Sequence, residues 1–299
     1  MTPARPALRW HGGKWRMAPW VISHFPSHRV YVEPFGGAAS VMLRKPAIPA
    51  EVYNDLDMTV VTLFRVLRDP VKALELQRRL RLTPFARAEF DWSYEAAVDD
   101  IDRAHKTIIR SFMGFGSDSV TRSCRTGFRT KLSDERALPS QSWSSFWEAV
   151  PSFTDRFSGV TIENKPALEI IDRYDMPQTL FYLDPPYLHG TRSSLVGRSK
   201  RTHGYTHEMS DDDHEQLLDR INAMSGMCII SGYPSPVYDA ALSEWRRVER
   251  KAMADGARAR TEVLWLNPAA TEQLASEQRA AERRSRTYRQ QSLFQEAAN

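Results

Sequence analysis

The chain has 299 residues, of which 41% are hydrophobic and 26% charged, and this is the composition of an ordinary globular protein of one or two domains. Its formal charge of +4 and pI of about 9.1 permit a polyanionic partner without requiring one. Two cysteines, Cys124 and Cys228, are too few to build a zinc site between them, and no apolar run approaches the roughly 20 residues that span a bilayer. We therefore expect a cytoplasmic protein with reduced thiols and no membrane partner.

The first 70 residues read as the beginning of an α/β unit. Residues 29–33, "RVYVE", predict a strand that ends at the turn "PFGG", and "AASVMLRKP" predicts a helix that stops at Pro46. A second strand is expected from Ala50 to Tyr53, before "NDLD", and a helix that begins at Thr59 and stops before Pro70. Strand, glycine turn, helix, strand and acid are typical of a doubly wound α/β fold.

The pattern changes between residues 71 and 150. This segment predicts amphipathic, charged helices, followed by the Gly-, Ser-, Thr- and Arg-rich run "MGFGSDSVTRSCRTGFRTKLSDERALPS". Loops of that length are usually functional or disordered. We interpret residues 71–150 as an inserted helical lobe that carries a long basic loop.

The α/β pattern returns after residue 150. Strands are expected at 159–164, at "QTLFYLD", at "MCIISGY" and at "RTEVLWLN", with a helix at "ALEIIDRY". Ser210 and Asp213 fit a capping box that begins a further helix. Residues 1–70 and 151–270 should therefore form one catalytic domain, and residues 271–299 a charged helical or frayed tail.

Two features in the first unit suggest a nucleoside-like ligand. The turn "PFGGAAS", residues 34–40, lets the backbone approach a ligand, although it is neither a GxGxxG nor a P-loop motif. Asp55 follows the next strand, where an acid in doubly wound folds binds ribose hydroxyls. The alternatives are a tight turn and a helix N-cap, and Asp57 is better placed than Asp55 for the cap.

The third motif is "LDPPY", residues 183–187, at the end of an apolar strand. The carboxylate of Asp184 and the carbonyl of Pro185 are two acceptors held by the fixed φ angles of the prolines. Two converging acceptors suit an exocyclic amino group, and Tyr187 offers a face on which a base can stack. The alternative is a proline-terminated strand with a capping acid.

These motifs together resemble those of the DNA adenine-N6 methyltransferases of the Dam type, the D12 class. "RWHGGKWRM" is similar to the opening motif of the family, "VEPFGGAASV" to its glycine motif, "YNDLD" to its acidic motif and "FYLDPPY" to its catalytic motif. The similarity extends over most of residues 9–70 and 160–267. It implies a doubly wound mixed sheet of the S-adenosylmethionine-dependent methyltransferase type, with the helical lobe as target-recognition region.

The resemblance also implies S-adenosylmethionine as methyl donor, double-stranded DNA as substrate, a bacterial or phage-encoded enzyme and, by default, a monomer. Asp184 and the Pro185 carbonyl would accept the two hydrogens of adenine N6, and Tyr187 would stack on a base turned out of the duplex. The cofactor-binding positions that it implies are Trp10, Lys14, Glu33, Phe35, Gly37, Asp55 and Asp184.

Two departures from the family pattern matter. Ala39 stands where the glycine motif has its last glycine, and we expect modestly altered packing if its φ is negative. The hairpin that carries the GATC preference of the family is not evident, so that preference is not carried over. The basic loop instead offers four candidate phosphate contacts, Arg122, Arg125, Arg129 and Lys131, or it is simply solvated.

Other chemistries are less well supported. N4-cytosine methylation also acts on an exocyclic amine, but a serine in place of Asp184 would have favoured it. An inactive donor-binding, DNA-binding module is disfavoured by the intact "DPPY". His203, His207 and His214 lack a carboxylate–histidine framework, so we expect surface histidines and no metal site.

Overall fold

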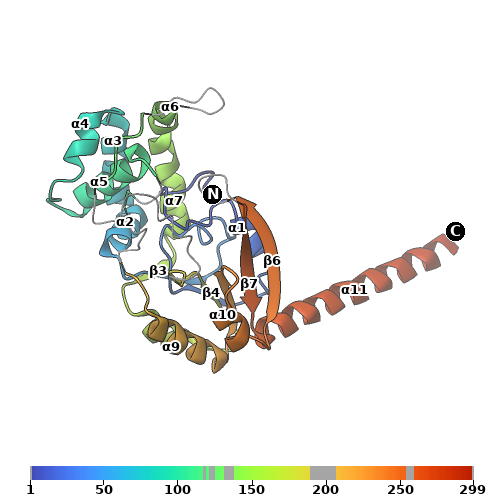
Figure 1. Ribbon diagram of the computed structural model, residues 1–299. Helices are drawn as coiled ribbons and strands as arrows, with labels where there is room; N and C mark the ends of the chain where they lie inside the picture. Colours follow the sequence, from blue (N-terminus) through green and yellow to red (C-terminus); the bar gives the residue numbers. More distant parts are fainter. Residues whose placement is uncertain are drawn as a thin grey trace.

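A twisted seven-stranded sheet forms the centre of the molecule (Figure 1), which we describe from a computed structural model that covers residues 2–116, 119–120, 125–130, 138–188, 207–253 and 259–297. The strand order is β3-β2-β1-β4-β5-β7-β6. The strands are β1 (Val30–Glu33), β2 (Ala50–Asn54), β3 (Val160–Glu163), β4 (Thr179–Leu183), β5 (Met227–Gly232), β6 (Arg246–Met253) and β7 (Ala259–Leu266).

Strands β1 to β5 are parallel, and β7 is antiparallel to both of its neighbours. In the register of the central strands, Val32 lies beside Val52 on one side and beside Phe181 on the other. The chain leaves β1 in one direction toward β2 and β3 and later returns on the other side as β4 and β5. In such sheets a crevice opens at the carboxyl ends of the strands where the order reverses, here between β1 and β4. The expected doubly wound mixed sheet is confirmed.

Alternation along the strands produces two cores, one on each face of the sheet. In β4, Leu180 and Tyr182 belong to one buried cluster, and Phe181 and Leu183 to the other. This follows from the period of two along a strand, and it explains why the four residues "LFYL" that follow Thr179 are all hydrophobic.

Helices cover both faces. The second cluster packs against α8 (Ala167–Tyr174), α9 (Asp211–Asn222) and α10 (Pro236–Ala241). The remaining helices are α1 (Ala18–Ile22), α2 (Met58–Arg68), α3 (Pro70–Leu82), α4 (Arg87–Trp92), α5 (Asp100–Met113), α6 (Pro139–Ser144), the 3-10 helix η1 (Phe146–Ala149), α7 (Val150–Phe157) and α11 (Pro268–Ala297).

Helices α3 to α6 form a lobe beside the sheet, and α2 and α7 connect this lobe to the strands (Figure 1). The ring of Phe64 in α2 stacks on that of Phe157 in α7 with 4.5 Å between centroids. Within the lobe, the Phe112 and Phe146 rings are also 4.5 Å apart. The lobe thus has an apolar interior that is continuous with the first core cluster.

Several expectations for local structure are corrected. Residues 38–45 form turns rather than a regular helix, with i to i−4 bonds only from Leu43 to Ala39 and from Lys45 to Val41. Ala39 has a φ of +52°, so the negative φ on which we made modestly altered packing conditional is absent, and this left-handed residue interrupts helical geometry at the start of the segment. Strand β6 was not predicted. The charged segment after residue 271 belongs to α11, which projects away from the body (Figure 1).

Candidate active site

A cavity of about 290 Å³ opens at the carboxyl ends of β1, β2 and β4. Its walls include each of the predicted cofactor-binding positions: Trp10, Lys14, Glu33, Phe35, Gly37, Asp55 and Asp184. Helices α8 and α9 and the segment 207–209 contribute further lining residues. The fold therefore gathers the four sequence motifs around one space, at the crevice that its topology predicts.

Asp184 is held at the end of β4 by a charged and a neutral donor. Lys14 Nζ lies 2.9 Å from Asp184 Oδ1 and 3.0 Å from Oδ2, and its third contact is the Gly12 carbonyl at 3.1 Å. Ser231 Oγ donates to Oδ1 at 2.9 Å, and the Tyr182 hydroxyl lies 3.0 Å from Ser231 Oγ. Although burial alone lowers the pKa of Lys14, the Asp184 carboxylate raises it well above its usual value. Lys14 is therefore an ammonium group that bonds to both oxygens of the Asp184 side chain.

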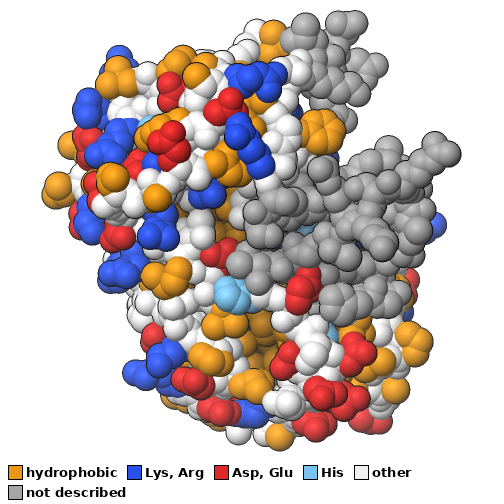
Figure 2. Space-filling model, turned by 60° about the vertical axis from the view of Figure 1, so that its left-hand side comes forward, with side chains coloured by type: hydrophobic (Ala, Val, Ile, Leu, Met, Phe, Trp, Pro, Cys, Tyr) orange, Lys and Arg blue, Asp and Glu red, His pale blue; other side chains and the backbone are white. Residues whose placement is uncertain are grey.

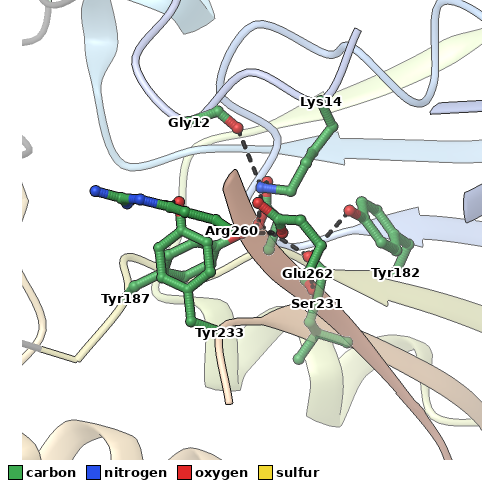
Figure 3. Close-up of polar contacts among 10 residues, drawn as sticks. Gly12, Lys14, Tyr182, Tyr187, Ser231, Tyr233, Arg260 and Glu262 are labelled. Carbon is green, nitrogen blue, oxygen red and sulfur yellow. Dashed lines mark hydrogen bonds and ion pairs between the residues drawn. The ribbon is translucent and has the colours of Figure 1, made fainter. Parts of the chain in front are cut away.

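Tyr187 lies beside Asp184 but outside the cavity lining, as does the buried Pro185. Its hydroxyl is 3.3 Å from Asp184 Oδ1 and 3.2 Å from Glu262 Oε2 (Figure 3). Lys14 Nζ is 4.9 Å from the centre of its ring. Burial and the nearby Asp184 raise the pKa of Tyr187 well above its usual value, so the phenol keeps its proton.

The glycine turn is packed tightly against β2. A Cβ on Gly36 would lie 2.2 Å from Tyr53 Cε2, and one on Gly37 would lie 2.9 Å from Trp10 Nε1. Gly37 also has a φ of +47°, which favours glycine. The Tyr53 hydroxyl donates to the Gly37 carbonyl at 2.7 Å. The close approach of backbone to neighbouring rings is the reason for two glycines here.

Asp55 and Asp57 have different roles: one caps a helix and the other lines the cavity, a choice that the sequence left open. Asp57 is the N-cap of α2 and accepts from the Thr59 amide at 2.8 Å. Asp55 instead accepts from the Gly37 amide at 2.7 Å and from the Asp57 amide at 2.8 Å, and it lines the cavity. Burial raises the pKa of Asp55 to about 6. Asp55 therefore ties the second strand to the glycine turn at the cavity wall.

Glu33 is the most perturbed carboxyl group of the cavity. Only 3% of the residue is exposed, and burial raises its pKa to about 8 despite a 2.6 Å hydrogen bond from the Tyr31 hydroxyl. At neutral pH the side chain is therefore largely protonated in the free protein. A carboxyl held in this way will ionise when a cationic group of a ligand reaches it.

We predict that Glu33→Gln removes a pH dependence of stability. Because the native pKa of about 8 exceeds the reference value of 4.5, the unfolded chain loses this proton first as pH rises. Glu33 therefore reduces the free energy of unfolding between these pH values, with a slope of up to about 1.4 kcal/mol per pH unit. In urea unfolding without ligand, the free energy of unfolding of the variant relative to that of the wild type should be higher at pH 7.5 than at pH 5.5.

Glu163→Gln is the matched control, because Glu163 also accepts a tyrosine hydroxyl, that of Tyr174 at 3.2 Å, in a half-buried position. Its stability difference from the wild type should stay nearly constant over the same pH range. A Glu33→Gln difference that is equally constant would contradict the burial argument.

Sequence reasoning missed three residues next to Asp184. Ser231 and Tyr233 come from the end of β5, and Glu262 comes from β7. The Tyr233 ring meets that of Tyr187 edge to face with centroids 4.5 Å apart. A polar residue in the apolar run "MCIISGY" was the available signal for Ser231. No comparable signal marks Glu262, because its approach depends on the antiparallel insertion of β7 beside β5.

The predicted phosphate contacts are only partly described. Arg122 and Lys131 lie outside the described residues. Arg125 pairs with Asp91 and lies over the Tyr94 ring, and Arg129 is half-buried with a lowered pKa because of burial. These two arginines are therefore engaged with the helical lobe itself.

Of the three histidines, His203 lies outside the described residues and His207 lines the cavity. The expectation of a surface position is wrong for His214, which is buried with Nδ1 2.8 Å from the Tyr238 hydroxyl. Within the described ranges, no group of three His, Cys, Asp or Glu side chains is placed to hold a metal ion. Within the same ranges, no helix is both long enough and apolar enough to cross a bilayer.

Comparison with known proteins agrees with the geometry of the cavity. The sequence model of the D12 class N6 adenine-specific DNA methyltransferase family matches residues 10–225. This range includes the opening motif, the glycine turn, Asp55, the helical lobe and "DPPY". No curated protein matches the chain.

Proposed function

Because the chain belongs to the D12 class N6 adenine-specific DNA methyltransferase family, we propose that it transfers a methyl group to N6 of an adenine turned out of the duplex, with Asp184, Pro185 and Tyr187 as catalytic residues. Membership implies that the enzyme methylates adenine in DNA with S-adenosylmethionine as methyl donor. Turning a base out of the stack costs roughly a few kcal/mol, because its base pair and its stacking contacts are lost. The proposal thus concerns how the residues of this chain hold the base and the donor.

The observation that carries the proposal is the environment of Asp184. Its Oδ1 atom accepts from Lys14, Ser231 and Tyr187, whereas Oδ2 accepts only from Lys14 among the described residues. An ionised carboxylate with a remaining acceptor position, at a cavity wall, suits an N–H donor of the target amine. The Pro185 carbonyl follows in the chain and would accept the second hydrogen.

Hydrogen bonding by Asp184 and Pro185 would help the amine to react. The lone pair of adenine N6 is delocalised into the ring, so the group is a weak nucleophile. Two acceptors fixed on a rigid Pro-Pro segment stabilise the tetrahedral nitrogen and the positive charge that develops on it. Tyr187 would stack on the base and hold it in line for the transfer.

The cavity residues fit the donor. Glu33 would become ionised on binding the methionyl ammonium. Asp55 would accept from ribose hydroxyls through oxygens already positioned by the Gly37 and Asp57 amides, and Trp10 would pack beside the glycine turn. S-adenosylmethionine supplies the methyl group on a sulfonium centre, and Gly36 and Gly37 line the cavity that would hold it.

The helical lobe is the proposed DNA-binding region. Figure 2 shows Lys and Arg side chains over the lobe, in the upper part of the view, and a concentration of Asp and Glu side chains in the lower part. Helix α9 begins there with the exposed Asp211, Asp212 and Asp213. A duplex would approach from the lobe side, with Arg122, Arg125, Arg129 and Lys131 as backbone contacts. For Arg125 this requires exchanging Asp91 for a phosphate.

The test is methylation of mixed-sequence duplex DNA with isotopically labelled S-adenosylmethionine, followed by digestion to nucleosides. The label should appear in N6-methyl-2′-deoxyadenosine. Label in N4-methylcytosine, or donor binding without transfer to any base, would overturn the adenine assignment.

A further inference from the structure

The Tyr187 hydroxyl lies between two carboxyl groups. Asp184 Oδ1 is 3.3 Å away on one side, and Glu262 Oε2 is 3.2 Å away on the other. Figure 3 shows Glu262 of β7 reaching toward the same point as Lys14 and Ser231. Glu262 has no part in the family motifs, and it is half-buried.

One hydroxyl proton cannot serve both carboxyl groups. A phenol donates a single hydrogen bond, so a second contact at hydrogen-bonding distance requires that the other carboxyl group supply a proton. Two carboxylates sharing one site in this way favour protonation of one of them.

The neighbouring donors decide which carboxyl group is protonated. Asp184 accepts from Lys14 with both oxygens and from Ser231, and these contacts stabilise its ionised form. Among the described residues, the hydrogen-bond partner of the Glu262 carboxyl group is the Tyr187 hydroxyl. Burial raises the pKa of Glu262. The charge of Lys14 opposes this shift, as does the more weakly acting Arg260, but the charge of Asp184 acts with burial and the net shift is upward.

We propose that Glu262 holds a proton in the resting enzyme and donates it to the Tyr187 hydroxyl, which donates in turn to Asp184. Glu262 is then a positioning residue: it fixes the Tyr187 ring and directs the phenol proton onto the catalytic carboxylate. This inference rests on the proposed role of Asp184 and Tyr187 in methyl transfer, and it adds the requirement that a neutral β7 side chain be present.

The surroundings of Glu262 are consistent with a neutral donor. On β7 itself Arg260 donates to the Tyr233 hydroxyl at 2.9 Å and lies 5.0 Å from that ring. On β6 the cross-strand partner Arg250 lies over the Trp20 ring at 6.0 Å. From the other elements, Lys14, Asp184, Tyr187 and Tyr182 face this region. Lys14 bonds to Asp184 and Gly12.

The consequence is a pH limit on activity. When Glu262 ionises, its carboxylate and that of Asp184 both compete for the phenol proton of Tyr187. The Tyr187 hydroxyl then no longer donates to Asp184 alone. We therefore expect the turnover number of the wild type to decline on the alkaline side as Glu262 loses its proton.

The decisive comparison is between two substitutions. Glu262→Gln keeps an N–H donor of the same shape that cannot ionise, so its kcat should stay within about threefold of the wild type and its alkaline decline should disappear. Glu262→Ala removes the donor, so kcat should fall by about tenfold while KM for the methyl donor is unchanged. Glu249→Gln, at an exposed position of β6, controls for a glutamate-to-glutamine change on the same hairpin away from Tyr187, and it should keep the kcat and the alkaline decline of the wild type.

Each outcome decides the proposal. If Glu262→Gln loses as much activity as Glu262→Ala, the side chain is needed as a carboxylate, and the neutral positioning role is wrong. If Glu262→Gln keeps the alkaline decline of the wild type, another group causes that decline, and the proposal is wrong for that reason.

A readout that does not depend on turnover separates this inference from the proposed function. In protein labelled with 13C at glutamate Cδ, the Glu262 signal, assigned by its loss in Glu262→Gln, should have the shift of a protonated carboxyl at pH 7. The shift of a carboxylate at that pH would overturn the proposal even if the wild type methylates adenine. Label transferred to cytosine would instead overturn the proposed function and leave the protonation state of Glu262 decided by its shift.

Discussion

Replacing Asp184 by alanine should lower methyl transfer to adenine by about a thousandfold or more at saturating donor and DNA. The substitution removes the acceptor that would hold N6 and the negative charge that would stabilise the developing cation. It also leaves Lys14, with only 7% of its side chain exposed, without its carboxylate partner. Breaking a buried pair in this way is destabilising by about 3 kcal/mol. The folded fraction must therefore be measured with the rate.

Two further variants separate chemistry from folding. Asp184→Asn keeps the volume and one acceptor oxygen but loses the charge, so it should be about a hundredfold slower than the wild type and more stable than Asp184→Ala. Asp55→Ala should do the opposite: it raises the dissociation constant of the donor and leaves kcat within a few-fold at saturation. Substantial turnover by folded Asp184→Ala protein would show that the catalytic carboxylate lies elsewhere.

The parts of the fold that the sequence predicts well are those whose signals are local. The buried strands β1, β4 and β5 carry apolar runs, and the N-caps at Asp57 and Ser210 are set by side chains within three residues. Strand β6, "RRVERKAM", gives no such signal because it is an edge strand. Most of its side chains are exposed, and its pairing with β7 provides the order that its own sequence does not encode.

The candidate site likewise contains residues that have a local sequence signal and residues that have none. Trp10, Asp55 and Asp184 stand in motifs with recognisable spacing, and the fold brings them to one cavity. Ser231 reaches Asp184, and Glu262 reaches Tyr187, only because β5 and β7 follow β4 in the sheet, a neighbour relation between segments distant in sequence. Ala39 shows the limit of a residue-by-residue comparison. An alanine where the family has glycine favours a negative φ, but Ala39 has a φ of +52° and the turn keeps the left-handed conformation.

Gly36→Ala should destabilise the protein by about 3 kcal/mol, because the added methyl group overlaps a side chain that has no room to move. The new Cβ would lie 2.2 Å from Tyr53 Cε2 and 2.9 Å from the Asn54 carbonyl. The Tyr53 ring is fully buried against Phe64, and its hydroxyl is bonded to the Gly37 carbonyl. Since that bond positions the cavity wall, the dissociation constant of S-adenosylmethionine should also rise by tenfold or more, a change of about 1.4 kcal/mol.

Gly159→Ala is the matched control, because a Cβ at Gly159 meets nothing within 4 Å, and its effect on stability should stay within about 0.5 kcal/mol. Urea unfolding and donor titration of both variants test the prediction. The cause is tested by combining Gly36→Ala with Tyr53→Leu, which removes the ring that the methyl group would strike. If the clash is the cause, the double variant will lose less free energy of unfolding than the sum of the losses of the two single variants. Additive costs would show that the Tyr53 ring is not the obstacle, and the Asn54 carbonyl, 2.9 Å from the new Cβ, would then be the contact that excludes a side chain.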